Sequence, residues 1–470
     1  MPRKSKPPTS PTAGPAAPPQ DAGNSAPIPT SGPQFGQPNV SPDPTKFVIK
    51  HGSDNAAYNI LDKTKQYPRA FPLVPGVDEP VVTLQAALGS NGARITAQIQ
   101  QTGQIVFHSV GDTGNTRGPD DQNKVADKMT SDFTETDPRA VPSFFFHLGD
   151  VVYSFGEAKY YYDQFYDPYR DYPAPIFALA GNHDGMIAPS TDVKTLAAFL
   201  ENFCTAGQTP HRTPESGELL RTAQIQPGVY YTLEAPFVRI IALYSNTLED
   251  PGVISSEGGL YANITDTQLT FLTAALTRVK KQNYQGALIL AVHHPPYVCV
   301  TDGDASPSKH GNSPRMLKDI DTICKKVGVW PHAFLCAHAH NYQRFTRTDG
   351  PRQTPFVLAG NGGHGLAKLT KKGDPTIRAP QDQSALSNGS DKVTFENYDD
   401  TAFGYLRIIA NIKQLRIEYH PESDGAGAKT PDDSVTVDLA AHKLAVYSPL
   451  DATANLGPKK VRAKKTGASK

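Results

Sequence analysis

The middle of the chain alternates apolar, β-branched and aromatic runs with polar or helical segments. Six runs of strand length stand between residues 104 and 336: Gln104–Val110, Ser143–Leu148, Pro175–Ala180, Val238–Tyr244, Ala287–Val292 and Ala333–Cys336. Runs that are apolar at consecutive positions are typical of strands that are covered on both faces. The pattern therefore predicts a set of buried strands.

Helical periodicity appears between these runs. The clearest helix is expected from Thr265, because Thr265-Asp266-Thr267-Gln268 reads as a capping box. The apolar side chains that then fall on one face, at spacings of three and four, are Leu269, Leu272, Leu276 and Val279. A second helix is predicted over 191–203, and short strands without helices between them at 355–359, 404–409 and 414–419. Alternating strands and helices predict an α/β domain.

The two ends of the chain differ from the middle in composition. Residues 1–45 hold 13 prolines and almost no aliphatic side chains, so the segment cannot bury enough apolar surface to offset its ordering entropy. Residues 457–470 carry six Lys or Arg and no acid. We therefore expect disordered segments over 1–45 and 457–470, and one catalytic domain over 48–450.

Charge and cysteine content narrow the class of protein. The chain of 470 residues has 46 Lys plus Arg against 46 Asp plus Glu, which gives no general field for nucleic acid or an anionic membrane. No apolar run approaches the roughly 20 residues of a membrane span.

The four cysteines show no CxxC pair, and free thiols fit best, although one or two disulfides stay open. No apolar h-region follows the basic start, which favours the cytoplasm, with secretion by another route left open.

Several predicted strands end in glycine followed by a residue that can bind a metal ion. The residues collected in this way are Asp112, Asp150 with Tyr153, Asn182 with His183, His293 with His294, and His338 with His340. Ligand sites in α/β sheets form where strands end, because the loops that leave neighbouring strands converge there. Mixed oxygen and imidazole donors suit zinc, iron or manganese. The set is too large for one tetrahedral ion, but two ions about 3.5–4 Å apart that share one carboxylate would use it. His108 and His147 lie inside strands and are expected to be packed or hydrogen-bonded.

In this order the motifs resemble the calcineurin-like metallophosphoesterase superfamily, in its purple acid phosphatase-like branch. They are GDTG (111–114), GDVVY (149–153), GNHD (181–184), HHPP (293–296) and AHAH (337–340). The resemblance spans about 105–420. It implies a four-layer α/β/β/α sandwich of two mixed sheets flanked by helices, with a dinuclear metal site at the carboxyl ends of the strands.

The resemblance also implies a division of the ligands between two ions. Asp112, Asp150, Tyr153 and His340 would hold one ion, and Asp150, Asn182, His293 and His338 the other, with Asp150 bridging. A phenolate from Tyr153 would favour trivalent iron, paired with Fe(II), Zn(II) or Mn(II). One departure from the family pattern is Ala337, which replaces a glycine beside the ligand His338 and is expected to be tolerated.

The chemistry implied is hydrolysis of a phosphate monoester by a water that the two ions activate. His183 resembles the residue that protonates the leaving group, and His310 resembles a second histidine of the mammalian-type branch. A small phosphorylated substrate is expected, while nucleic acid is not indicated and the oligomeric state stays open.

Two other functions stay open. One is a phosphodiesterase or nucleotide hydrolase on the same two-metal core, a choice that depends on loops at 186–235 and 297–316. The other is a metal-holding binding protein without turnover, against which the retention of all seven ligands and His183 argues.

Overall fold

The computed structural model describes residues 79–186, 195–204, 213–217, 219, 221–222, 224–246, 251–261, 264–299, 310–369, 379–387, 389–425 and 427–450. The expected disordered segments 1–45 and 457–470 lie outside these residues, so both expectations and the domain bounds 48–450 stay predictions. All four cysteines are described, and all are free.

The described residues form two mixed sheets. The first, in spatial order, consists of β1 (Val81–Thr83), β5 (Tyr231–Ala235), β6 (Val238–Leu243), β7 (Ala287–Val292), β8 (Ala333–Cys336), β10 (Arg352–Ala359), β9 (Tyr342–Asp349), β12 (Lys392–Asp399) and β11 (Gln381–Asp382). The second consists of β16 (Lys443–Leu444), β15 (Asp433–Asp438), β14 (Gln414–Pro421), β13 (Gly404–Asn411), β2 (Gln104–Val110), β3 (Phe145–His147) and β4 (Ile176–Ala178).

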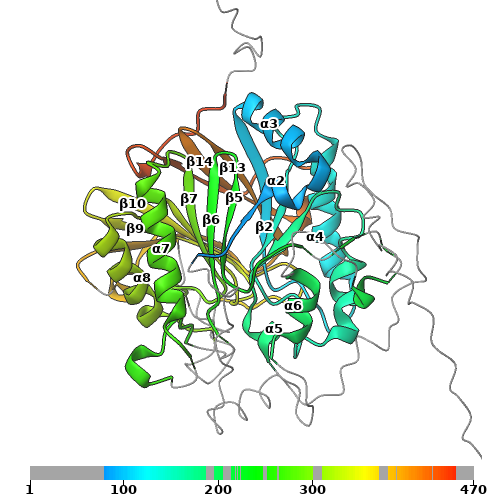
Figure 1. Cartoon of the computed structure of the whole chain (residues 1–470), viewed down its shortest axis with the longest axis horizontal. Coiled ribbons are helices and arrows are strands. Elements are labelled where there is room, and N and C mark those ends of the chain that lie inside the picture. Colours follow the sequence, from blue (N-terminus) through cyan, green and yellow to red (C-terminus); the bar gives the residue numbers. More distant parts are fainter. Residues whose placement is uncertain are drawn as a thin grey trace, which may run out of the picture.

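Helices flank the two sheets, as the fold-class prediction expected (Figure 1). They are α2 (Leu84–Ala87), α3 (Gly92–Thr102), α4 (Asp120–Ser131), α5 (Asn182–Gly185), α6 (Ala197–Phe203), α7 (Thr267–Lys281) and α8 (Pro314–Val327). α7 and α8 pack against each other, and α7 also contacts β6 of the first sheet. α3 contacts β2 and α4 contacts β13, so these helices cover the second sheet.

The predicted strands are present, and their apolar character comes from burial. Every side chain of β3, β4, β7 and β8 is buried. His108 and His147 are packed as expected: His108 Nε2 lies 3.0 Å from Asp132 Oδ2, and His147 Nε2 lies 2.8 Å from Thr113 Oγ1. The sequence did not predict α3, α4, α8, β5, β9, β12 or β15.

The predicted capping box at Thr265 is wrong. Helix α7 begins at Thr267, with Asp266 as its N-cap and no side-chain hydrogen bond from that cap. The Gln268 amide instead bonds the backbone of Tyr244, accepting from its N–H at 2.8 Å and donating to its carbonyl at 2.7 Å. The second predicted helix is α6, which covers only 197–203. Residues 191–194 of that prediction lie outside the described part of the chain.

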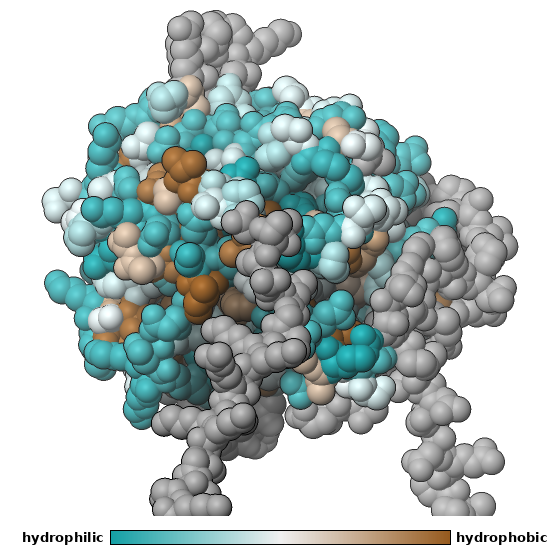
Figure 2. Space-filling view, turned by 90° about the horizontal axis from the view of Figure 1, so that it is seen from above, coloured by the Kyte–Doolittle hydropathy of each residue, from teal (hydrophilic) through white to brown (hydrophobic). Residues whose placement is uncertain are grey.

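The surface is mainly hydrophilic on the face seen from above, with its apolar spots separated from one another (Figure 2). Large apolar side chains that are exposed within the described ranges are Val81, Leu260, Ile412 and Val446. In those same ranges, no helix combines the length and the apolar character that crossing a bilayer requires.

Candidate metal centre

Parallel strands deliver the predicted side chains to one edge of the two sheets. β2, β3 and β4 are parallel neighbours in one sheet, and β7, β8 and β10 are parallel neighbours in the other. The motif segments 111–114, 149–153, 181–184, 293–296 and 337–340 leave β2, β3, β4, β7 and β8 in turn. Gly111 N–H donates to Ala359 O at 2.9 Å, and this bond joins the loop after β2 to the end of β10 in the other sheet.

Four of the predicted ligands lie in the left-handed backbone region, which non-glycine residues rarely adopt. Their φ angles are 53° for Asp112, 54° for Asp150, 76° for His338 and 47° for His340. Such conformations cost about 1–3 kcal/mol each and persist where the surrounding structure enforces them, often at functional sites. Here they turn four side chains toward a common centre.

Glycines allow the close approach of these loops. A Cβ added to Gly181 would overlap the Asp150 carboxylate, and one added to Gly360 would lie 2.6 Å from Asp112 Oδ2. Ala337, the one departure from the family motif, fits because Gly111 faces it: a Cβ on Gly111 would stand 2.6 Å from the Ala337 methyl. Two alanines could not occupy this contact, so Gly111 accommodates the extra methyl.

The first predicted ligand group surrounds the Tyr153 hydroxyl. This hydroxyl donates toward Asp112 Oδ1 at 2.8 Å and Asp150 Oδ2 at 3.0 Å, and lies 3.2 Å from His340 Nε2. His340 Nε2 is 3.4 Å from Asp112 Oδ1. The structure therefore brings together all four residues that the resemblance assigned to one ion.

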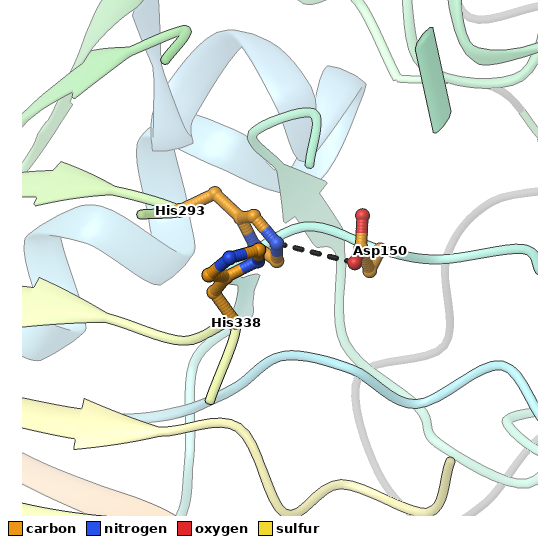
Figure 3. A group of neighbouring side chains, drawn as sticks. All are labelled: Asp150, His293 and His338. Atoms are coloured by element: carbon orange, nitrogen blue, oxygen red, sulfur yellow. Dashed lines mark ion pairs between the residues drawn. The ribbon is translucent and has the colours of Figure 1, made fainter. Parts of the chain in front are cut away.

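The second predicted group meets the first at Asp150. His293 Nε2 lies 3.0 Å from Asn182 Oδ1 and 3.2 Å from Asp150 Oδ2, and His338 Nδ1 lies 3.0 Å from the same Asn182 oxygen. Figure 3 shows the His293 and His338 rings overlapping in the view and His293 paired with Asp150, and the two ring centroids are 5.1 Å apart. Asp150, His293 and His338 are also spaced to hold a metal ion among themselves. Asp150 thus contacts both groups, as its predicted bridging position requires.

The donor chemistry of the second group fits a cation. His293 Nδ1 donates to Leu148 O at 2.8 Å, because a carbonyl only accepts. In a neutral ring, Nε2 is then an acceptor, and it faces the oxygens of Asn182 and Asp150, which are acceptors as well. Burial, the largest influence, lowers the pKa of His293, but the carboxylates of Asp150 and Asp112 outweigh it and raise the pKa to about 9. The cluster therefore requires a positive charge at this point, which a proton or a metal ion can supply.

The Asp150 carboxylate is held ionised. Burial by itself would raise the pKa of Asp150, but the charges of His293 and His183 outweigh it and hold the pKa far below its usual range. Burial, together with Asp112 and Asp150, raises the pKa of Tyr153 well above its usual value. In this arrangement Tyr153 is a neutral phenol, so binding as a phenolate would require a cation that displaces its proton.

His183 and His310 lie at the border of the ligand set. His183 Nδ1 donates to Ser154 O at 2.8 Å, which leaves Nε2 as the ring atom that can gain and lose a proton. The His310 ring is centred 4.7 Å from His338 and 5.0 Å from His340. Half of the loop at 297–316 that was expected to shape the pocket, residues 300–309, lies outside the described residues.

Two further residues belong to the site and were missed. Asp184 accepts hydrogen bonds from the N–H groups of Val151 at 3.0 Å and Gly181 at 2.9 Å, so it ties together the loops that carry Asp150 and Asn182. Burial and the nearby Asp150 raise its pKa to about 7. His364 stacks on Tyr153 with ring centroids 3.5 Å apart. The sequence could have indicated His364, because the segment 360–364 (GNGGH) follows β10 in the same way as the motifs follow their strands.

A model of a known protein family agrees with this geometry. The family model for calcineurin-like phosphoesterases matches residues 107–342, which is half of the chain, and the protein belongs to that family. It is accordingly a metal-dependent phosphoester hydrolase, of a family that typically binds a dinuclear metal site.

The two solved structures described below have low sequence identity to this chain. No curated protein matches the chain. A solved structure titled "Structure of PhoD" is 14% identical with a TM-score of 0.45, over 75% of this chain and 73% of that chain. A predicted phosphoesterase from Streptococcus pneumoniae TIGR4 is 9% identical with a TM-score of 0.26, over 71% of this chain and 98% of that chain.

Proposed function

We propose that this phosphoester hydrolase is a purple acid phosphatase-like enzyme that hydrolyses phosphate monoesters. Asp112, Asp150, Tyr153 and His340 hold Fe(III) in this proposal. Asp150, Asn182, His293 and His338 hold a divalent ion, which is Fe(II), Zn(II) or Mn(II). The four free thiols favour a reducing compartment, the cytoplasm, as the place of action.

One observation carries the assignment to this branch. The Tyr153 hydroxyl lies within 3.2 Å of atoms from Asp112, Asp150 and His340, so a single ion could contact all four side chains. A tyrosine that only packed below the site would point its hydroxyl at a backbone carbonyl instead. A phenolate is a hard anionic donor, which suits trivalent iron better than zinc or calcium.

The chain's own side chains carry out the remaining steps of the reaction. Two bound ions would supply an activated water and neutralise charge on the phosphate oxygens. His183 holds a proton at Nε2 and gives it to the oxygen of the leaving alcohol, a role typically worth about 10²–10⁴-fold in rate. His310, beside His338 and His340, orients the phosphate. Asp184 keeps the loops of Asp150 and Asn182 in register.

Iron loading tests the proposed metal site. Protein reconstituted with iron should hold two metal ions per chain and be violet or pink, because an Fe(III)–phenolate pair absorbs visible light. Tyr153→Phe should bleach the colour while the protein keeps most of its metal, since Asp112, Asp150 and His340 remain. A colourless parent protein, or a Phe variant that keeps the colour, would leave a generic two-metal phosphoesterase.

Substrate class is tested with aryl phosphates. The loaded enzyme should hydrolyse an aryl phosphate monoester faster than the matching diester. A preference for the diester would favour the phosphodiesterase or nucleotide hydrolase that the sequence left open. Full metal content with no turnover of either ester would favour a metal-holding binding protein.

A further inference from the structure

His364 makes a close ring contact with Tyr153. The two ring centroids are 3.5 Å apart and the ring planes are inclined by 16°, which is a parallel stack. His364 comes from the loop after β10, far along the chain from the GDVVY segment. It is half-buried, and its ring also lies 5.0 Å from that of His340.

The His364 ring is fixed by the loop that carries Asp112. Its Nδ1 donates to Gly114 O at 2.7 Å, since a carbonyl only accepts, and its backbone N–H donates to Asp112 O at 3.0 Å. Gly362 N–H donates to Gly111 O at 3.1 Å in the same contact. The imidazole is therefore anchored to the main chain at Gly114, and the backbone of its own loop is anchored at Gly111 and Asp112.

A second imidazole lies on another side of the same phenol. The His183 ring is centred 4.2 Å from that of Tyr153, and the two imidazoles are 6.4 Å from each other. Tyr153 thus stands between a histidine with no assigned role and the histidine that protonates the leaving group. A change in the tilt of the phenol would move both its hydroxyl and its contact with His183.

We propose that His364 is a positioning residue of the metal centre. Its ring holds the Tyr153 phenol in the plane that directs the hydroxyl toward Asp112, Asp150 and His340, and through the phenol it fixes the distance to His183. This inference rests on the proposed function, because it takes Tyr153 as an iron ligand and His183 as the acid.

Three variants separate the two contacts of His364. His364→Phe keeps an aromatic ring for the stack and loses the bond to Gly114 O. His364→Asn keeps an N–H donor for that bond and loses the ring. His364→Ala loses both. His442→Ala is a matched control, because it removes another half-buried histidine with a ring neighbour, His332 at 4.9 Å, away from the metal centre.

The first measurement is the visible absorption band of each iron-loaded protein, together with its iron content. We expect the Ala and Asn variants to shift and weaken the band while still binding iron, and the Phe variant to keep the parent band. The second measurement is the ratio of kcat on an alkyl phosphate to kcat on a nitrophenyl phosphate. Since the alkyl leaving group depends on His183, this ratio should fall about 10-fold in the Ala and Asn variants, as expected for the loss of a ring contact. It should stay unchanged in His442→Ala.

The outcomes separate the two claims. A coloured, active parent whose band and rate ratio survive in His364→Ala overturns the inference and leaves the proposed function standing. The inference is likewise overturned if His364→Phe is altered as much as His364→Ala, because the ring would then not be the positioning element. A parent that stays colourless with iron removes the proposed function, and this inference with it.

Discussion

Strand β2 borders two buried polar clusters that differ in how the charge of the central carboxylate is balanced. One surrounds Asp132 and reaches His108 within the strand, while the other surrounds Asp150 and reaches Asp112 just after the strand. Both central carboxylates are almost inaccessible, Asp132 with 1% and Asp150 with 0% of its surface exposed. The two carboxylates differ in the groups that surround them.

Around Asp132, donors face an acceptor. Lys429 Nζ lies 2.5 Å from Oδ1, while His108 Nε2 at 3.0 Å and the Tyr405 hydroxyl at 3.1 Å reach Oδ2. Arg407 adds a second cation 3.6 Å away. Burial would raise the pKa of Asp132, but the hydrogen bonds from His108 and Lys429 outweigh it and hold the pKa well below its usual range.

Around Asp150, the donors are the Tyr153 hydroxyl and the His183 backbone N–H instead of a lysine or arginine, and the backbone is strained as well. The cluster holds carboxylates, an amide oxygen and imidazole nitrogens, and the described residues bring no Lys or Arg within ion-pairing distance of Asp150. A cluster whose charges are paired within the protein is complete without an added ion. A cluster in which the lone pairs of several side chains converge on one point is arranged to bind a cation from solution. Burial and the number of charges are similar in the two clusters and would not distinguish them. The clusters differ in whether cationic side chains donate to the central carboxylate.

The largest expected effect is that of Asp150→Asn, which removes the shared anion between the two ligand groups. We expect hydrolysis to fall below detection, and affinity for both ions to fall by more than about 100-fold, since even residues behind the metal ligands contribute 10–100-fold. Metal analysis of the purified protein and a phosphate-release assay measure this. Asp132→Asn is the matched control, because it makes the same change at an equally buried carboxylate. Equal metal content in both variants would remove the distinction between the clusters.

His183→Ala is expected to keep both ions and to slow turnover by about 10²–10⁴-fold on an alkyl phosphate. On a nitrophenyl phosphate the loss should be much smaller, because that leaving group needs no proton. Steady-state kinetics with the two esters and metal analysis check this. An alkyl phosphate turned over at the parent rate would exclude the acid role.

Asp132→Asn is expected to lower the free energy of unfolding by about 3 kcal/mol, because it leaves Arg407 and the partly exposed Lys429 without their carboxylate. Metal content and kcat at a temperature where the protein is folded should match the parent. Urea unfolding followed by circular dichroism gives the stability change. Lost metal in this variant would show that the cluster supports the centre, contrary to the comparison.

The smallest expected effect is a change in acid sensitivity at Glu418, which borders the Asp132 cluster through Arg407. Burial raises the pKa of Glu418, but hydrogen bonds from His420 and Arg416 outweigh it and lower the pKa to about 2. Because this lies below the usual value of 4.5, the ionised form stabilises the fold above that pH, and the contribution is lost as the pH falls from 4.5 toward 2. Glu418→Gln should lower the stability at pH 7 by about 1–3 kcal/mol and flatten its decline below pH 4.5. Unfolding curves at pH 7, 5, 4 and 3 measure this, and parallel declines in parent and variant would contradict it.

The elements that the sequence predicted are those whose pattern depends on burial alone. β7 and β8 are apolar at every position because both faces are covered. β9 was missed because it carries Arg344 and Arg347, whose partners Asp433 and Asp321 come from other elements. The capping box at Thr265 failed for the same reason, since the Gln268 amide is taken by Tyr244. A local pattern cannot show a polar partner that lies elsewhere in the chain.

The sequence by itself determined the seven predicted ligands of the candidate centre, although not Asp184 and His364. Each motif follows a buried strand, and the carboxyl ends of parallel strands meet at one edge, so a strand end and a polar residue are enough to place Asp112, Asp150 or His338 near a common point. Only the tertiary structure decided which atoms face one another there. It turned the Tyr153 hydroxyl toward two carboxylates, stacked His364 on the phenol and gave Asp132 a lysine 297 residues away. Those contacts depend on side-chain direction and loop packing across the two sheets, which no spacing along the chain encodes.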